Sequence, residues 1–463
     1  MTTPTSAMAT PPPPPTPSAA AAAATAASAG RPAATPAPPA PPAGAPAPSG
    51  AARSALTGLL AGTPGRLRAL GVLGVVAALV FGLGAAQAFR SASGAVDRAA
   101  ANADQVVRIQ AIQTNVVQAD AVATNAFLVG GLEPASQREA YTTAIATASA
   151  LIAEAAQNQP ADGAALAALN TELVAYAGQI EIARANNRQG LPIGAQYLRS
   201  ASADLRAQAL PLLSNLAQAN DERVALEFNR AGQALWWLMV PGLLALAALG
   251  AALTWIARHS HRYVNVPLAG AALVVLVTLV GGAAGLLGVK ADVDTTRDGE
   301  YAATRAVAAA RTAAFDAKAN ESLTLIARGS GAAFQEAWAA SSEAVTTQFA
   351  TLDANLVATG LDEQLWADYV AAHEEIRALD DSGDWDGAVD LATGTGAGTG
   401  NTTFAAFDED SAQVLSDVAD RTASSLADTG GWLPIGGILS VLVGLLAAGL
   451  SWWGVSQRLE EYR

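Results

Sequence analysis

The sequence predicts an all-α membrane protein with four transmembrane helices and two extracytoplasmic antiparallel four-helix bundles, internally duplicated. Three observations predict this fold class. Apolar residues gather in four blocks without charge, each of about 20 residues, which is the length that a helix needs to cross a bilayer. The segments between the blocks have helix-forming composition, and the two halves of the chain match at a nearly constant offset.

The first 65 residues are predicted to form a disordered cytoplasmic tail. Residues 1–65 hold 16 of the 23 prolines, long alanine runs and no acidic residue. Because this stretch has little large apolar surface to bury, folding could not offset the entropy of ordering it. A solvated tether is the favoured interpretation, and a docking tail for a partner is the alternative.

The four spans are predicted at residues 69–89, 235–257, 267–289 and 432–454. Arginines lie before the first span, in the loop 258–266 and in the tail 455–463. Since positive charge in short flanks marks the cytoplasmic side, we expect both termini to be cytoplasmic, in a multi-pass protein of the cell membrane. The two long segments, 90–234 and 290–431, then form the extracytoplasmic bundles.

Tryptophans near the span ends are predicted to anchor the helices at the membrane interface. They are Trp236, Trp237, Trp255, Trp432, Trp452 and Trp453. The pair Gly281 and Gly285 would allow two helices to approach closely, although a glycine-rich span produces this spacing by chance.

The two halves of the chain show matching landmarks. Trp236 and Trp432 are 196 residues apart, and the starts of the first and third spans are 198 apart. The stretch DAVATNAFLVGG begins at Asp120, and DAKANESLTLIARGSG begins 196 residues later at Asp316. The repeat unit is therefore predicted to be a span, an outer domain and a second span.

Apolar residues recur three or four apart in the outer segments, as on one face of a helix. The stripes are Ile109, Ile112, Val116, Ala119 and Ala123; then Leu205, Ala209, Leu212, Leu216 and Ala219; and, in the second segment, Val307, Ala310, Ala314 and Ala317. Glycine and proline break the first segment at 130–134, 159–160 and 190–192. These breaks predict four helices, the first continuing from span one and the last continuing into span two.

Charge differs sharply between the outer segments. Residues 90–234 hold 13 acidic and 10 basic residues, whereas residues 290–431 hold 25 acidic and 8 basic residues. A solvated surface is the simplest interpretation of the acidic segment, and a docking surface for a basic partner is the alternative. The net charge of −14 argues against nucleic-acid binding.

No enzyme, cofactor or metal site is predicted. Cysteine is absent, and no nucleophile–base arrangement is visible. The acidic stretch 380–387 departs from the calcium-loop pattern, so we expect Ser382 or Asp384 to cap a helix and Trp385 to pack against the bundle. The glycine-rich run from Thr393 is predicted to be a linker, and His373 to lie on a solvated helix face. The spans carry no ionisable residue, which argues against transport.

The histidine pair in the cytoplasmic loop is better explained by contact with lipid headgroups than by a metal site. His259 and His261 have no carboxylate or thiolate beside them.

The layout of the chain indicates its class of function. Large outer domains joined to small inner segments are typical of a receptor or a relay.

At these residues the chain resembles a known family. Four spans, the helix ends NAFLVGG and NESLTLIARGSG, and the C-terminal WWGVSQRLEEYR are similar to the four-pass membrane protein of an actinobacterial amino-acid-sensing pathway. The resemblance covers the chain after the tail, and its most specific part is 454–463. It implies a non-enzymatic relay between an extracytoplasmic lipoprotein that binds glutamate, aspartate or glutamine and a cytoplasmic serine/threonine kinase, protein kinase G. That kinase adjusts nitrogen metabolism and the 2-oxoglutarate dehydrogenase step.

A relay of this kind passes its signal by contact. The C-terminal helix end continues span four, so we expect it to contact the partner, and a simple stop-transfer anchor is the alternative. The expected contact residues are Arg458, Glu460, Glu461 and Arg463. The alternatives to the relay are a chemoreceptor-like direct sensor and an envelope scaffold. The sequence leaves open whether the chain forms a homodimer. Direct sensing would be favoured if polar seam residues such as Asn125, Asn320 or Arg311 line a pocket.

Overall fold

The computed structural model describes residues 63–129, 132–260, 265–354 and 358–460. These residues all lie in one compact unit, Leu59–Arg463. Within the described ranges, the regular elements are helices and none is a strand, which confirms the all-α prediction for this part of the chain. Residues 1–62 of the predicted disordered tail lie outside the described residues.

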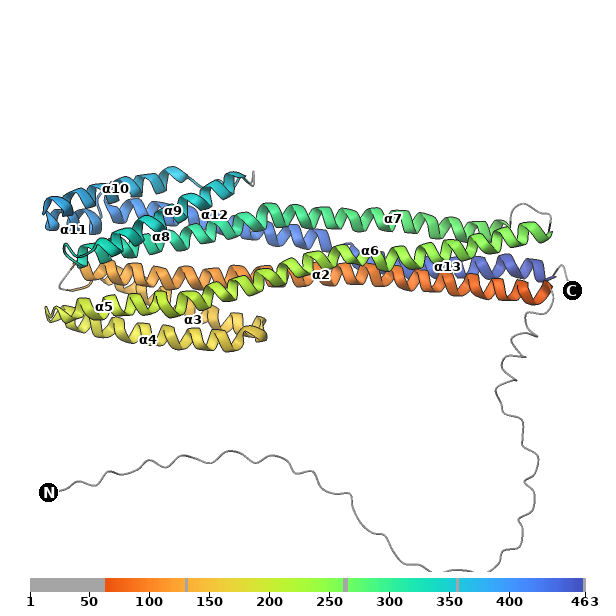
Figure 1. Cartoon of the computed structure of the whole chain (residues 1–463), viewed down its shortest axis with the longest axis horizontal. Coiled ribbons are helices and arrows are strands. Elements are labelled where there is room, and N and C mark those ends of the chain that lie inside the picture. Colours follow the sequence, from red (N-terminus) through yellow and green to blue (C-terminus); the bar gives the residue numbers. More distant parts are fainter. Residues whose placement is uncertain (1–62, 130–131, 261–264, 355–357, 461–463) are drawn as a thin grey trace, which may run out of the picture. The chain divides into compact units, whose positions relative to one another are not determined.

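Four long helical paths run along this unit (Figure 1). The elements, in chain order, are α2 (Thr63–Val129); α5 (Ile193–Asp204), η2 (Leu205–Ala209) and α6 (Leu210–Ser260); α7 (Val266–Thr296), η3 (Arg297–Tyr301) and α8 (Ala302–Ile326); and α12 (Gly400–Gly430) with α13 (Leu433–Glu460). Each path contains an 18-residue window with a mean hydropathy of 1.9 to 2.4. Four helices are therefore long and apolar enough to cross a membrane, and the chain is a multi-pass membrane protein.

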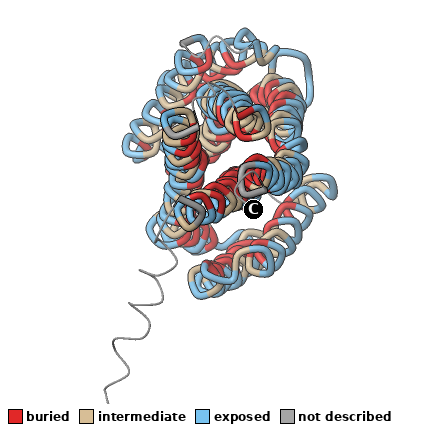
Figure 2. Tube along the Cα trace, turned by 90° about the vertical axis from the view of Figure 1, so that its right-hand side faces the viewer, coloured by how far each residue is buried: buried red, intermediate tan, exposed pale blue. Residues whose placement is uncertain are grey.

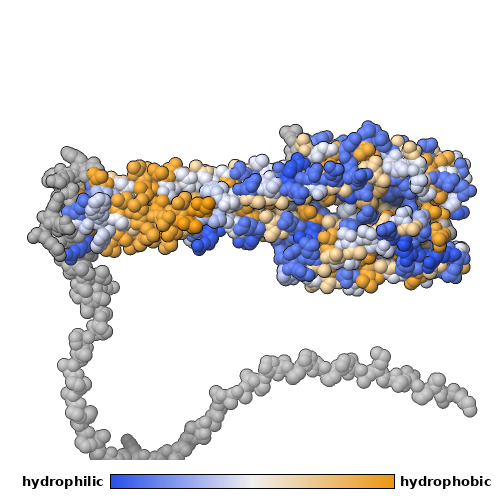
Figure 3. All heavy atoms as spheres, turned by 180° about the vertical axis from the view of Figure 1, so that it is seen from behind, coloured by the Kyte–Doolittle hydropathy of each residue, from blue (hydrophilic) through white to orange (hydrophobic). Residues whose placement is uncertain are grey.

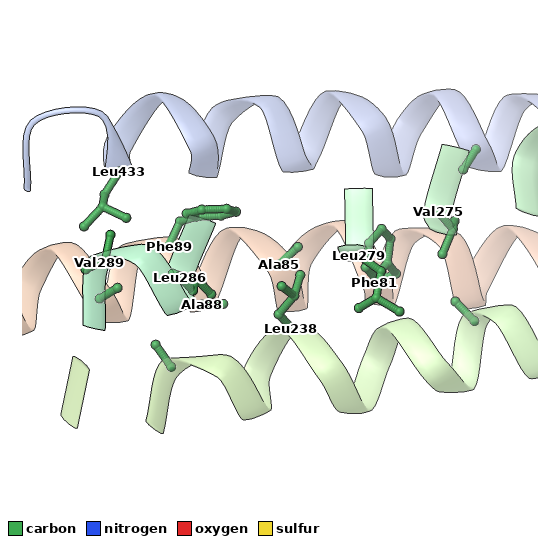
Figure 4. Close-up of a cluster of buried hydrophobic side chains, with 14 of the residues drawn as sticks. Phe81, Ala85, Ala88, Phe89, Leu238, Val275, Leu279, Leu286, Val289 and Leu433 are labelled. Atoms are coloured by element: carbon green, nitrogen blue, oxygen red, sulfur yellow. The ribbon is translucent and has the colours of Figure 1, made fainter. Parts of the chain in front are cut away.

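The apolar windows pack together in one shared core. Figure 4 shows side chains from α2, α6, α7 and α13 meeting there, and Figure 3 shows the hydrophobic outer surface that surrounds them. Phe81, Phe89, Leu238, Leu279 and Leu433 are among its buried members. The helical paths continue beyond this core, so the polar part of each path is rigidly continuous with its apolar part.

Helices α2 and α13 cross at a pair of glycines. A Cβ atom placed on Gly444 would lie 2.7 Å from Cα of Gly82, and one placed on Gly82 would lie 2.8 Å from Cα of Gly444. The neighbour is backbone in both cases and cannot rotate away. The sequence also contains the pair Gly281 and Gly285. A Cβ atom placed on Gly285 would lie 2.7 Å from the Trp432 ring, whereas one placed on Gly281 would meet nothing within 4 Å.

Replacing Gly444 with leucine is expected to lower the free energy of unfolding by about 1–3 kcal/mol, since the larger side chain must separate the two helices. Gly449→Leu on the same helix is the control, because a Cβ atom there meets nothing within 4 Å. Chemical denaturation of the purified protein in lipid or detergent measures both changes. Equal losses for the two variants would show that the crossing is looser than described.

A first helical group is formed by the polar half of α2, by α3 (Ala135–Asn158) and α4 (Gly163–Arg188), and by α5, η2 and the first half of α6. The helices end close to the predicted breaks, and their inner faces share one core. All five residues of the first predicted stripe, from Ile109 to Ala123, are buried in it. Asp162 lies in a short 3-10 turn, η1 (Pro160–Asp162), between α3 and α4.

One register in this group differs from the sequence pattern. Leu205, Ala209 and Leu216 are buried as expected. Leu213 is fully buried in place of Leu212, and both Leu212 and Ala219 of the predicted stripe are half-buried. The reason is η2, a π-helical turn, which inserts an extra residue per turn and rotates the helix that follows.

A second helical group comprises α8, α9 (Ala332–Ala354), α10 (Glu363–Ser382), α11 (Trp385–Thr393) and α12. Its core is rich in aromatic side chains, including Phe315, Trp338, Tyr369 and Phe407. All four alanine and valine residues of the predicted stripe 307–317 are buried. Asp384 caps α11 by accepting a hydrogen bond from the Gly387 backbone N–H at 3.0 Å, which confirms the predicted cap. The glycine-rich run from Thr393 connects α11 to α12, as predicted.

The two groups pack against each other along α2 and α8. Val117 and Ala121 of α2 belong to the core of the second group, and the hydroxyl groups of Thr114 and Thr312 lie 3.2 Å apart. Helix α8 is buried over 18 of its 25 residues, so it lies at the centre of the polar part of the unit. Figure 2, viewed along the helices, shows buried residues on the faces that the helices turn toward one another.

Candidate functional site

The junction between the helical groups is held by one arginine. Arg206 lies on the π-turn η2 and its Nη1 atom is 2.8 Å from Oδ2 of Asp120 on α2. Its Nη2 and Nε atoms lie 2.8 and 2.9 Å from Oδ1 of Asp316 on α8. A single guanidinium therefore joins three of the four long helical paths.

Asp120 is 1% exposed and is the most buried acid of this junction. Besides Arg206, it accepts hydrogen bonds from the Tyr176 hydroxyl at 3.1 Å and the Ser202 hydroxyl at 2.6 Å. Burial and the neighbouring charge of Asp120 raise the pKa of Tyr176 well above its usual value. Burial lowers the pKa of Arg206, but the two carboxylates outweigh it and the net shift is upward. The arginine thus stays charged at neutral pH.

Asp316 connects this ion pair to the second group. Its Oδ2 atom accepts hydrogen bonds from the Ser341 hydroxyl at 2.7 Å and from Asn320 Nδ2 at 3.1 Å. Asp120 and Asp316 are the residues that open the two matching stretches of the sequence, and Arg206 brings them to one point. A π-turn is unusual in long helices and frequently occurs at functional sites, because the extra residue redirects a side chain.

A second polar cluster is buried inside the second group. The Glu321 carboxylate lies 2.7 Å from Lys318 Nζ and 2.9 Å from His373 Nδ1, and it accepts a hydrogen bond from the Tyr369 hydroxyl at 3.2 Å. Burial raises the pKa of Glu321, but Lys318 and His373 outweigh it and lower the pKa to about 2. The cluster therefore holds an ionised carboxylate inside an aromatic core.

The predicted solvated position of His373 is wrong. Its side chain is 1% exposed and stacks on the Trp338 ring with centroids 3.6 Å apart, while the neighbouring Glu374 and Glu375 are exposed. Consecutive residues on a helix point in different directions, so acidic neighbours in the sequence do not place a histidine at the surface.

The predicted packing of Trp385 is confirmed, since its indole N–H donates to the Leu325 carbonyl at 2.9 Å.

The distal end of the first group, farthest from the apolar windows, carries an arginine-lined pocket of about 270 Å³. Arg138, Arg184 and Arg188 line it together with Leu132 and Glu133. Arg184 is bound to Glu133 and Glu181 at 2.8 Å each and lies over the Tyr141 ring. Apolar side chains are exposed near the ends of α2, α4 and α5: Val129, Leu132, Leu191, Ile193 and Tyr197, of which Leu132 lines the pocket. Exposed apolar patches of this kind typically mark interaction surfaces.

Of the three polar seam residues, one lines a cavity among the described pockets. Asn125 faces a cavity between α2, α3, α8 and α12. Arg311 instead binds Asp408 at 2.6 Å, and Asn320 donates to Asp316. Asn125 is therefore a candidate ligand-binding residue, whereas Arg311 and Asn320 pair with side chains of the chain itself.

The residues expected at the membrane and at the cytoplasmic partner stay predictions. Trp236, Trp237, Trp452 and Trp453 are exposed, as lipid-facing anchors would be. Trp432 packs edge-on against Phe89 with ring centroids 5.7 Å apart, and Trp255 is half-buried. Helix α13 extends to Glu460, and Arg458 and Glu460 are its last charged residues. Glu461 and Arg463 lie outside the described residues, as does His261.

A comparison with protein families finds a match at residues 95–229. This segment matches the family model of the actinobacterial sensor domain. The match begins on α2 and ends on α6, so it coincides with the first helical group, including Asp120 and Arg206. No curated protein and no solved structure matches the chain. The sensor domain is a signalling domain and not a catalytic one, and it supports a sensing role in an actinobacterial protein.

Proposed function

We propose that the chain is a non-enzymatic transmembrane signalling relay with both termini in the cytoplasm and both helical groups outside the cell. The observation that carries the proposal is the continuity of two helices. The sensor-domain match begins on α2 and ends on α6, and each of these helices continues without interruption into its apolar window. A displacement of α2 or α6 in the outer part is therefore passed to its membrane part. The arginines that flank the spans on one side support this orientation.

The two helical groups are interpreted as duplicated four-helix bundles with different roles. The first carries the sensor-domain match and nearly balanced charge, whereas the second carries 25 acidic and 8 basic residues. The offset of 196 between Asp120 and Asp316, and their meeting at Arg206, supports a common origin. The groups would then move relative to each other about this ion pair.

The partners follow from the family resemblance. We propose that an extracytoplasmic lipoprotein, which binds glutamate, aspartate or glutamine, docks on the distal end of the first group. The exposed apolar residues and the arginine-lined pocket there support this position. On the inner side, we propose that the end of α13, with Arg458, Glu460, Glu461 and Arg463, contacts a serine/threonine kinase of the protein kinase G type. The output would be control of nitrogen and 2-oxoglutarate metabolism.

Replacing Leu132 with glutamate is expected to reduce capture of the lipoprotein at least tenfold, because a charge would be buried in an apolar contact. Leu132 is 84% exposed, so the change costs little folding stability. Val174→Glu is the control, since Val174 is 65% exposed on α4 of the same group and away from the pocket. Cross-linking in intact membranes followed by mass spectrometry measures capture. Equal capture by both variants would remove the distal end as the docking site.

A direct sensor resembling chemoreceptors is the second candidate function. The position of Asn125 on a cavity is the observation that favours it. In this account a small molecule acts on the helical groups themselves, and the relay to the cytoplasm is unchanged.

A further inference from the structure

A cavity of about 250 Å³ lies where the two helical groups meet. Gln118 and Asn125 of α2 and Gln137 of α3 line its first side, and Lys318 of α8 and Asn401 of α12 line its second. Residues of both groups thus line the cavity, and they include residues of three of the helical paths that reach the membrane, those of α2, α8 and α12. Its volume is close to the lower limit of small-molecule sites, which suits a ligand of about ten heavy atoms.

Two adjacent amide groups in this cavity are each half satisfied. Asn125 is 5% exposed, and its Oδ1 atom accepts hydrogen bonds from Gln137 Nε2 at 2.9 Å and Asn401 Nδ2 at 3.2 Å. Its Nδ2 donor and the Gln137 Oε1 acceptor are buried and have no partner among the described residues. Leaving a buried polar group unpaired costs free energy, so each hydrogen bond that a ligand supplies favours its binding.

The remaining walls limit what can enter. Phe315 and Phe404 pack edge to face with centroids 5.1 Å apart and provide an apolar surface. Lys318 is 4% exposed and is already paired with Glu321, while Asp408 is paired with Arg311. Both charges therefore have partners. Among the described residues that line the cavity, the buried side-chain atoms without a partner are one neutral donor, Asn125 Nδ2, and one neutral acceptor, Gln137 Oε1.

We propose that this cavity binds a small molecule with a primary carboxamide group. The carboxamide oxygen accepts from Asn125 Nδ2, and its NH₂ group donates to Gln137 Oε1. A carboxylate of the same shape satisfies the first contact but sets a negative oxygen against the Gln137 oxygen. The inference deepens the proposed function by placing a ligand between the two helical groups, and only its signalling role rests on that proposal.

Matched pairs of compounds test the chemistry on the purified full chain in lipid nanodiscs. Glutamine, asparagine and nicotinamide are compared with glutamate, aspartate and nicotinate by isothermal titration calorimetry. We expect at least one carboxamide to bind at least tenfold more tightly than its acid. Failure of all three carboxamides to bind, or a preference below tenfold for the carboxamide in all three pairs, would overturn the proposal.

Variants test the position. Asn125→Asp removes the free donor with little change of volume and is expected to weaken carboxamide binding at least tenfold. Asn115→Asp is the matched control on the same helix, since Asn115 donates to the Ala111 carbonyl and lines no described pocket. Gln137→Glu is a second variant with the same expected loss, should the aspartate at 125 lower folding. Unchanged affinity in folded Asn125→Asp or Gln137→Glu would move the site elsewhere.

The outcome is separable from that of the relay. Binding is measured without any partner, so it stands if no lipoprotein or kinase is captured. Conversely, capture of both partners with no carboxamide binding keeps the relay and overturns this inference.

Discussion

Replacing Arg206 with methionine is expected to lower the free energy of unfolding by about 3–5 kcal/mol, which is the usual cost of removing one partner of a buried ion pair. Asp120 is 1% exposed and would keep only the Tyr176 and Ser202 hydroxyls as hydrogen-bond partners. Asp316 would lose the same guanidinium, so this ionic contact between the two helical groups would be lost. Chemical denaturation of the full chain in lipid measures the change.

Arg305→Met is the matched control for this experiment. Arg305 also joins two helical paths, through Asp221 at 3.1 Å, but its side chain is 47% exposed. An exposed pair of this kind contributes about 0–1 kcal/mol. Adding Asp120→Asn to Arg206→Met should recover part of the loss, since it removes the unpaired charge. A loss for Arg206→Met no larger than that for Arg305→Met would contradict the central role of the junction.

The second large effect is expected at Glu321. Glu321→Gln leaves the Lys318 ammonium buried without its counter-charge, and an unfolding free energy lower by about 3–5 kcal/mol is expected at neutral pH. Glu343→Gln on α9 is the control, because Glu343 is an exposed acid of the same helical group. Equal stability of the two variants would show that the buried cluster does not stabilise the second group.

Acidification provides an independent readout of the same carboxylate. The pKa of Glu321 is lowered to about 2 in the folded chain, below its ordinary value of 4.5. A group with a lowered folded-state pKa stabilises fully above its unfolded value and loses this contribution as the pH falls through its folded value. Glu321 should thus contribute on the order of 3 kcal/mol above pH 4.5, lost between about pH 4.5 and 2. The stability gap between wild type and Glu321→Gln should narrow over that range, and a constant gap would assign the loss to other acids.

The membrane-crossing helices and the helix ends were open to prediction from the sequence. A charge-free block of about 20 residues is best explained as a membrane span, and glycine together with proline marks the ends of the helices between the first two spans. The first helical group shows this directly, because α2 ends at Val129, just before Gly130, and α5 begins just after Pro192.

The junction was not open to prediction, for a physical reason. Arg206, Asp120 and Asp316 are ordinary helix residues in the sequence, and periodicity assigns a face to a residue without naming what lies opposite. No feature of the sequence composition predicts the π-turn that carries Arg206. The same turn is the reason that the prediction of a buried Leu212 was wrong. The close crossing at Gly82 and Gly444 is similarly hidden among 42 glycines.

The most direct test of the relay is affinity isolation of the full chain from its own membranes, with and without glutamate, aspartate and glutamine, followed by mass spectrometry. The proposal predicts recovery of both a solute-binding lipoprotein and a serine/threonine kinase, with at least one of them changing in amount when the amino acids are added. Recovery of neither partner, with direct amino-acid binding by the purified full chain, would contradict the relay and favour the direct sensor.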